Sequence, residues 1–325
     1  TYPSHTTKGC VPLSSDVMIM KRKISFFVLP LILCLCLTGC KSTDYREAVG
    51  MQESGDYAAA AEVFQILGDY QDSASRLKLC NEYIFAIQSF DKALIKLEEE
   101  NTMLDTAIES AYAIAHSEET ALDESLRPAL EMTVSEALAA RIEEVERPDD
   151  LADITAATER MSGVDYSSIL SALAEKQEAL EYSMKQYALV NNPDEAYIIA
   201  CLGKISGILE IAAATEDNDP NRQLHKEGGY TSAVYFSYEK VDQSRLNGAS
   251  PIEKGTDSGG QVEVYATYEY AARRDAYLSN FDGTALGAGS HVVIGTCVIR
   301  TSNYLTATQQ NELTESIIAE LTKVG

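Results

Sequence analysis

The sequence predicts a mixed α+β protein in which long helices, packed as an antiparallel bundle or coiled coil, precede a small two-layer α/β head. Within residues 79–190, apolar residues recur alternately three and four apart, the spacing of helices that pack along a seam. Residues 191–325 instead mix short apolar runs, typical of strands, with capped helical stretches. The chain has 325 residues, 45% of them hydrophobic, which is enough for more than one core.

The chain is strongly acidic, with 26 Lys and Arg against 50 Asp and Glu and a formal net charge of −24. Such a surface repels phosphate backbones, so we expect no nucleic-acid partner. It also offers no polybasic attraction to anionic lipids.

The first forty residues have the features of an export signal. Met20 precedes the basic Lys21-Arg22-Lys23, and an apolar run follows. That run is shorter than the roughly 20 residues that span a bilayer, which is typical of a signal peptide. We therefore predict a signal peptide over 20–39 and interpret 1–19 as a spurious upstream segment.

The apolar run ends in Leu37-Thr38-Gly39-Cys40, which resembles the lipobox of bacterial lipoproteins at all four positions. The resemblance implies that Cys40 carries a thioether-linked diacylglycerol and that a signal peptidase recognises Leu37, Thr38 and Gly39. It also implies a lipid-anchored protein on the extracytoplasmic face of the cell membrane, because paired acyl chains anchor stably. An uncleaved signal anchor is the alternative.

The other cysteines of the mature chain are Cys80, Cys201 and Cys297. Their odd number and the lack of a CxxC pair predict neither a zinc site nor a disulfide framework. One disulfide or three buried thiols remain open, and the apolar runs around Cys201 and Cys297 favour buried thiols.

A Gly-Asp-Tyr triplet occurs at 55–57 and again at 68–70, and Ala60 and Phe64 follow the first at helical spacing. This pattern resembles about one and a half tetratricopeptide repeats, which implies a helical hairpin over 40–78 with glycine in the turn. Since such arrays need about three repeats for stability, the fragment favours a helical cap of the next domain over a large peptide-binding groove.

The seam over 79–190 contains two polar positions, Asn101 in its first long helix and Gln177 in its second. A buried Asn at such a position fixes register, and we predict that Gln177 faces it. The apolar pattern fits an intramolecular bundle, and a parallel dimer through residues 80–115 is the alternative. The seam positions of the first helix are Cys80, Tyr83, Ile87, Phe90, Leu94, Leu97, Asn101, Leu104, Ile108, Ala111 and Ala115.

The head, residues 191–325, is expected to begin with a helix, because Asn192-Pro193-Asp194-Glu195 is a strong start signal. Arg273 and Arg274 are expected on the solvent side of the head's second helix, and Gly295 marks a bulge or a close backbone contact. The expected elements are a helix over 195–212, strands over 230–238 and 261–266, a helix over 267–281, a strand over 291–300 and a helix from 307 onward.

Four segments of the head resemble a recurrent, uncharacterised C-terminal module of bacterial surface lipoproteins, which implies an autonomous domain and supplies no activity. The segments are 215–221, 228–230, 253–257 and 295–302.

The acidic loop of the head places Asp217, Asp219 and Asn221 at positions 1, 3 and 5 of a calcium-loop pattern. The pattern then fails, because Arg222 stands where a glycine is required and Gly228 where a glutamate is required. A calcium site and an Asx-rich turn are therefore both open.

No catalytic residue is predicted. The histidines of the head are His225 and His291, and although Ser290 precedes His291, adjacent side chains rarely face each other. We expect a lipid-anchored binding or scaffolding protein of the bacterial envelope, with a protein or cell-wall ligand. An envelope hydrolase acting on wall polymer or peptide, and a helical-repeat assembly factor, are the alternatives.

Overall fold

The computed structural model describes residues 40–283 and 289–325. The predicted signal peptide, including Leu37, Thr38 and Gly39, lies outside the described residues. Helices and one five-stranded antiparallel sheet make up the described chain, which confirms the α+β class. The chain divides into two compact units, the second of which begins at Glu82.

The first unit contains a hairpin of helices α1 (Lys41–Glu53) and α2 (Tyr57–Leu67). Gly55 makes the turn at φ +85°, and the carboxylate of Asp56 caps α2. The ring of Tyr45 lies edge-on against Phe64 and Tyr70, so aromatic side chains fill the space beside the hairpin.

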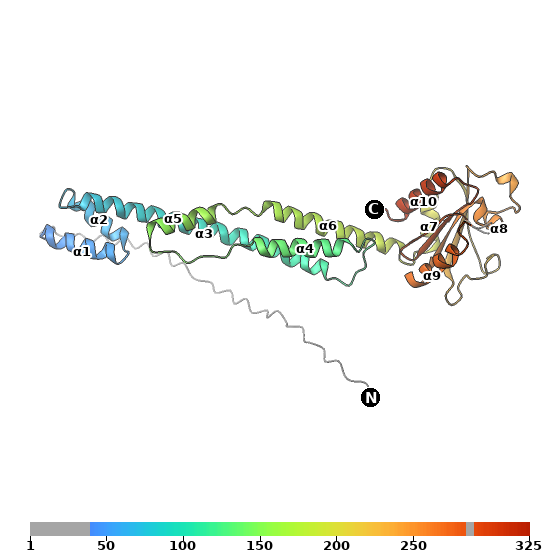
Figure 1. Ribbon diagram of the computed structural model, residues 1–325, viewed down its shortest axis with the longest axis horizontal. Helices are drawn as coiled ribbons and strands as arrows, with labels where there is room; N and C mark the ends of the chain where they lie inside the picture. The colour runs from blue at the N-terminus through green and yellow to red at the C-terminus, as the bar shows by residue number, and fades with distance from the viewer. Residues whose placement is uncertain (1–39, 284–288) are drawn as a thin grey trace, which may run out of the picture. The chain divides into compact units, whose positions relative to one another are not determined.

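Long helices dominate the part of the second unit that precedes the head. They are α3 (Ser73–Ala115), which begins in the first unit, α4 (Leu126–Ala140), α5 (Leu151–Ser162) and α6 (Ser167–Val190). Side chains of all of them share one apolar core, and α4 runs beside α6 (Figure 1). The apolar seam of α3 is thus covered by helices of the same chain.

Asn101 lies in this core with only 2% of its surface exposed. Its amide nitrogen donates to the carbonyl of Ile142 at 3.0 Å, and the Tyr166 hydroxyl donates to its oxygen at 3.0 Å. Gln177 instead contacts Ser110 and Glu181, so the predicted pairing of Asn101 with Gln177 is wrong. Ile142, in the segment after α4, makes the contact with Asn101 that was expected of Gln177.

The sheet of the head has the strand order β1-β2-β3-β5-β4, and every pairing is antiparallel. The strands are β1 (Ile208–Ala213), β2 (Tyr230–Tyr238), β3 (Gly259–Tyr265), β4 (His291–Ile294) and β5 (Cys297–Thr301). Short helical turns, η1 (Gln243–Arg245), α8 (Pro251–Lys254) and η2 (Gly255–Ser258), connect β2 to β3.

Two expected elements of the head have different limits. The first helix, α7 (Glu195–Leu202), ends before Gly203, and residues expected in the helix form β1 on the edge of the sheet. The expected strand over 291–300 splits into β4 and β5 at Gly295, which adopts φ +54° in the connecting turn. Glycines break both apolar runs, although the hydrophobic spacing alone favours continuation.

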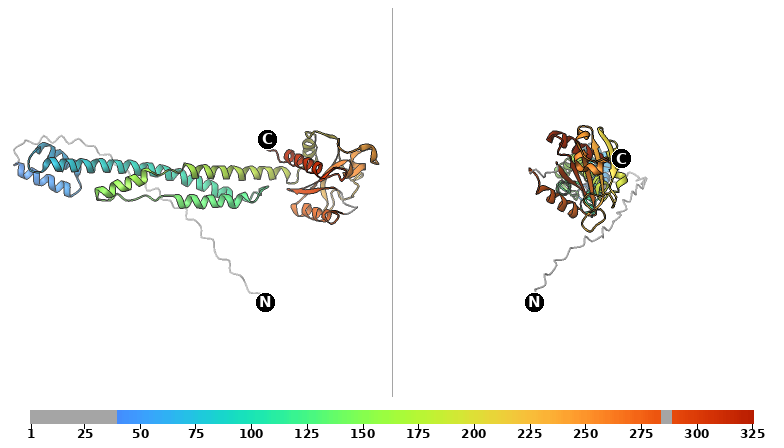
Figure 2. Two further views of the ribbon diagram at one scale, coloured as in Figure 1. Left: turned by 45° about the horizontal axis from the view of Figure 1, so that its top comes forward. Right: turned by 90° about the vertical axis from the view of Figure 1, so that its right-hand side faces the viewer.

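Helices cover both faces of the sheet, whereas the sequence predicted a two-layer head. α7 and α10 (Ala307–Leu321) pack with the apolar face of the sheet. α9 (Tyr268–Ser279) lies on the opposite side (Figures 1 and 2). The α9 face carries buried polar residues, which an amphipathic two-layer pattern does not anticipate.

The cysteines of the described chain are unpaired thiols. Cys80, Cys201 and Cys297 are buried, as favoured by their apolar neighbours, and Cys40 is exposed. Burial raises the pKa of Cys297 to about 12. Over residues 40–283 and 289–325, no helix has both the length and the apolar character needed to cross a bilayer.

Candidate functional site

A row of polar side chains crosses the sheet beneath α9. Tyr235 pairs with Gln261, Gln261 with Arg300, and Arg300 with His291, so these residues are direct neighbours on strands β2, β3, β5 and β4. Glu263 lies two residues further along β3 and therefore on the same face. Burial of charged groups is costly unless they are paired. The row of buried polar and charged residues therefore makes the sheet face under α9 the candidate functional site.

Glu263 is the centre of the site and has no exposed surface. Arg274, from α9, donates to it from Nε and Nη2, each at 2.8 Å. Arg300 Nη1 donates at 3.2 Å and the Tyr265 hydroxyl at 2.8 Å. Burial alone would lower the pKa of Arg274, but its bonds to Glu263 outweigh this and raise it. Two arginines thus share one carboxylate.

Two adjoining pockets, here called together the α9 pocket, open beside this ion-pair network. Their volumes are about 400 and 340 Å³, within the range of sites for small molecules. Asn221, Arg274 and Tyr277 line both. Tyr230, Tyr265, Tyr270 and Arg273 line the first, and Phe281, Asp282, His291 and Arg300 line the second.

Arg300 and Arg273 supply the pocket with positive charge. Arg300 is only 7% exposed, and its Nη1 donates to Gln261 as well as to Glu263, both at 3.2 Å. Within residues 40–283 and 289–325, no hydrogen-bond acceptor contacts its Nε or Nη2. Arg273 is exposed, lies 5.4 Å from the Tyr270 ring centre, and has no ion-pair partner in the same described ranges.

Neutral tyrosines form the walls of the α9 pocket. Burial raises the pKa of Tyr230, and it does the same for Tyr265, where the charge of Glu263 adds to the effect. Their rings meet edge-on with centroids 6.2 Å apart. These side chains therefore offer ring surfaces and hydroxyls, and no additional charge.

The acidic loop between β1 and β2 brings Asn221 to the pocket. Asp219 Oδ2 accepts the backbone N–H groups of Gln223 at 2.6 Å and Leu224 at 2.9 Å, and Oδ1 accepts that of Asn221 at 3.1 Å. Burial would raise the pKa of Asp219, but hydrogen bonds from Tyr230 and the backbone outweigh this and lower it. The Asx-rich turn is thus confirmed.

The three residues expected as possible calcium ligands have different surroundings. Asp217 is exposed, Asp219 is buried and caps its own loop, and Asn221 lies beside the Tyr235 hydroxyl. No three His, Cys, Asp or Glu side chains among residues 40–283 and 289–325 are placed to hold a metal ion.

His291 is held between two carboxylates at the rim of the pocket. Its Nδ1 lies 2.6 Å from Asp275 and its Nε2 lies 3.3 Å from Asp282. The Ser290 hydroxyl lies 2.6 Å from that of Thr301 and so belongs to a different contact. The structure therefore joins His291 to aspartates and does not join it to the neighbouring serine.

Sequence reasoning missed the Glu263–Arg274–Arg300 network. Arg274 was expected on the solvent side of its helix, yet most of its side chain is buried against β3. One signal was available: the alternate positions Gln261, Glu263 and Tyr265 place polar groups on one face of a strand that is entirely buried.

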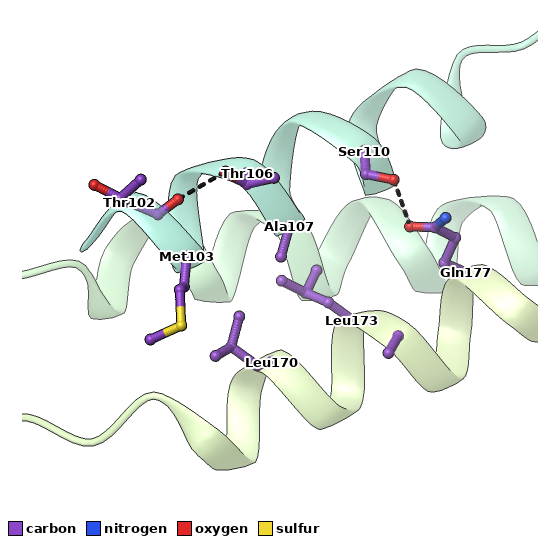
Figure 3. Close-up of a pocket in the computed structure, with 9 residues that line it drawn as sticks. Thr102, Met103, Thr106, Ala107, Ser110, Leu170, Leu173 and Gln177 are labelled. Carbon is purple, nitrogen blue, oxygen red and sulfur yellow. Dashed lines mark hydrogen bonds between the residues drawn. The ribbon is translucent and has the colours of Figure 1, made fainter. Parts of the chain in front are cut away.

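A groove of about 390 Å³ lies between α3 and α6 (Figure 3). Met103 and Leu170 lie across it from each other, and Ser110 donates to Gln177 at 3.1 Å. No charged side chain lines it. The groove is thus a gap in helix packing without groups that would orient a ligand.

The predicted lipid-attachment residue, Cys40, is exposed and precedes the first residue of α1. Comparisons of the chain with protein-family models, with curated proteins and with solved structures find no match.

Proposed function

We propose that this protein is a lipid-anchored binding protein of the bacterial cell envelope, held at the extracytoplasmic face by a diacylglycerol on Cys40. In this proposal an antiparallel helical bundle supports the head, and the α9 pocket of the head takes the ligand. The observation that supports binding is that Nε and Nη2 of Arg300 have no hydrogen-bond acceptor among the described residues, although Arg300 lines a pocket of small-molecule size.

The chemistry of the pocket favours binding over hydrolysis. Glu263 accepts hydrogen bonds from Arg274, Arg300 and Tyr265, so its lone pairs are engaged by cations and a phenol. A general base needs an acceptor within reach of the substrate's proton, and Glu263 offers none while these bonds stand.

His291 is equally constrained, because both ring nitrogens face aspartates and the nearest hydroxyl in sequence, that of Ser290, contacts Thr301. Nucleophilic catalysis needs a nucleophile within hydrogen-bond reach of its base, an arrangement that these contacts do not provide.

The anchor is supported by the lipobox resemblance at Leu37–Cys40 and by the exposure of Cys40. Two acyl chains contribute about 0.8 kcal/mol for each buried CH₂ group, enough to keep an acidic protein at a membrane that repels it.

Metabolic labelling tests the anchor. The full chain and its Cys40→Ser variant are expressed in a bacterium fed radioactive palmitate, and the membranes are isolated. We expect label on the parent and none on Cys40→Ser, whereas Cys80→Ser keeps the label. Equal labelling of the parent and Cys40→Ser, or an unlabelled parent, would contradict the proposal.

Thermal unfolding tests the binding role separately. A ligand that binds only the folded state raises the melting temperature, and the rise grows with the logarithm of the free ligand concentration above its Kd. We expect a low-molecular-weight extract of bacterial envelopes to stabilise the purified full chain, and an extract that never does so contradicts a binding role.

A further inference from the structure

Two other arginines of this protein show what the Nε and Nη2 side of Arg300 can bind. Arg274 uses Nε and Nη2 to hold both oxygens of Glu263, and Arg141 uses the same pair of nitrogens to hold Asp105 at 2.8 and 3.1 Å. These nitrogens form the edge of a guanidinium group that matches a carboxylate in two parallel bonds. In Arg300 the corresponding edge has no acceptor within the described ranges, and the residue lines the pocket.

The orientation of Arg300 is fixed from the other side. Its Nη1 is bonded to Gln261 and Glu263, which lie on the neighbouring strand. The amide nitrogen of Gln261 is itself buried without a hydrogen-bond partner in the described chain. Donors thus outnumber acceptors beside Arg300.

The charges of the site are mixed. Arg274, Arg300 and exposed Arg273 are cationic, and Glu263 bridges the first two. Asp275 and Asp282 share the single ring of His291 at the rim, and buried Asp219 is bonded to Tyr230. The preference for an anion therefore comes from the unbonded Nε and Nη2 of Arg300 and not from an excess of positive charge.

We propose that the α9 pocket binds the carboxylate of a small organic acid through Nε and Nη2 of Arg300, with Arg273 as the outer charge. The body of the acid lies against the rings of Tyr230, Tyr265 and Tyr277. The inference rests on the proposed binding function and names the ligand class for that site. A phosphate dianion fits less well, because the pocket offers one guanidinium fork and has the carboxylates of Asp275 and Asp282 at its rim.

A carboxylate of this size could belong to a sugar acid or to the C-terminus of a short peptide. The probes separate these sources: D-glucuronate with D-glucose as its neutral match, and N-acetyl-D-alanine with N-acetyl-D-alaninamide. Each is titrated calorimetrically into the full chain purified in detergent. We expect one carboxylate to bind with a Kd of about 1 mM or tighter while its neutral match does not bind.

Three variants locate the carboxylate. Arg300→Lys keeps the charge but loses the two-bond fork, so we expect affinity to fall about 10- to 100-fold. Arg273→Gln changes an exposed rim residue without disturbing the fold and should weaken binding about 3- to 10-fold. Arg245→Gln, a head arginine outside the pocket that is 77% exposed, is the matched control and should bind as the parent does.

Several results would overturn the carboxylate assignment. They are no binding of either carboxylate up to about 10 mM, tighter binding of inorganic phosphate, or a folded Arg300→Lys that binds normally. If Arg300→Lys does not fold, unchanged affinity of Arg273→Gln overturns it instead. When these probes fail but an envelope extract still stabilises the chain, the carboxylate is excluded and the binding role stands.

Discussion

Arg274 holds Glu263 in two parallel hydrogen bonds, with Nε and Nη2 each 2.8 Å from a carboxylate oxygen. The pair joins α9 to the middle strand of the sheet, where Glu263 is fully buried. A single carboxylate thereby neutralises part of a site that contains two arginines, and the stability of the head depends on that carboxylate.

Replacing Glu263 by Gln removes the only anion bonded to Arg274 and Arg300 in the described chain. Since a buried charge without its partner is strongly unfavourable, we expect the free energy of unfolding in urea to fall by about 3–5 kcal/mol. Glu315→Gln, on the exposed side of α10, is the control and should change it by less than about 0.5 kcal/mol. A loss below about 1 kcal/mol for Glu263→Gln would mean that the network is not a closed ion pair.

The lowered pKa of Asp219 makes its contribution to stability dependent on pH. A carboxyl group whose pKa is lower in the folded state stabilises the fold above its unfolded pKa of about 3.9, and this stabilisation disappears as the pH falls through the folded value. We expect Asp219→Asn to cost about 1–3 kcal/mol at pH 7, and the difference from the parent to shrink below about pH 4.

Denaturant unfolding of both proteins between pH 7 and pH 3 measures this difference. Asp217→Asn, in the same loop but exposed, is the matched control and should follow the parent at every pH. A difference between Asp219→Asn and the parent that stays constant across the range would show that the charge of Asp219 is not what holds the loop.

Calcium should leave the melting temperature of the full chain unchanged, because both oxygens of Asp219 already accept backbone N–H groups. A site with a Kd of about 1 mM would add about 1.4 kcal/mol at 10 mM calcium, enough to raise the melting temperature by a few degrees. Magnesium at the same concentration controls for ionic strength. A rise with calcium alone, abolished in Asp217→Asn, would restore the calcium interpretation of the loop.

The features that the sequence predicted correctly are local. Alternating three- and four-residue spacing identifies the apolar side of α3, because each position depends only on helix geometry. The α9 pocket differs, since Glu263 and Arg300 are 37 residues apart and meet only through strand pairing. Nothing in the local pattern distinguishes the half-buried Arg274 from the exposed Arg273 beside it, because the burial of both depends on a sheet whose strands lie elsewhere in the sequence.

The Asn101 contact shows the same limit within the helices. A polar seam position predicts a buried partner. The structure supplies two, the Ile142 carbonyl and the hydroxyl of Tyr166, the residue directly before α6, and neither is the predicted Gln177. Sequence spacing predicts which face is buried; the identity of the partner depends on how the connecting segments fold.

Tyr166→Phe tests that contact. The Tyr166 hydroxyl donates to Asn101 and accepts the N–H of Ile142 at 2.8 Å, so its loss leaves two buried polar groups unmatched. We expect the free energy of unfolding to fall by about 1–3 kcal/mol. Tyr182→Phe, on an exposed position of α6, should have no effect beyond about 0.5 kcal/mol.

A double variant separates the hydroxyl's partners. If Asn101 depends on Tyr166, the losses of Tyr166→Phe and Asn101→Ala in urea unfolding should be non-additive by at least about 0.5 kcal/mol. Strict additivity would indicate that water replaces the hydroxyl and that the bond contributes little.

Gly295 connects the end of α6 to the sheet. It adopts φ +54°, and a Cβ atom there would lie 2.5 Å from the Val190 carbonyl oxygen. The next residue, Thr296, donates its N–H to that same oxygen at 2.9 Å.

We expect Gly295→Ala to lower the free energy of unfolding by more than about 2 kcal/mol, because the contact adds to the cost of the left-handed backbone. Gly55→Ala isolates the backbone cost, since Gly55 has φ +85° with open space around it, and should lose only about 1 kcal/mol. Equal losses in urea unfolding would show that the α6 terminus yields freely and that Val190 does not fix its position against the hairpin.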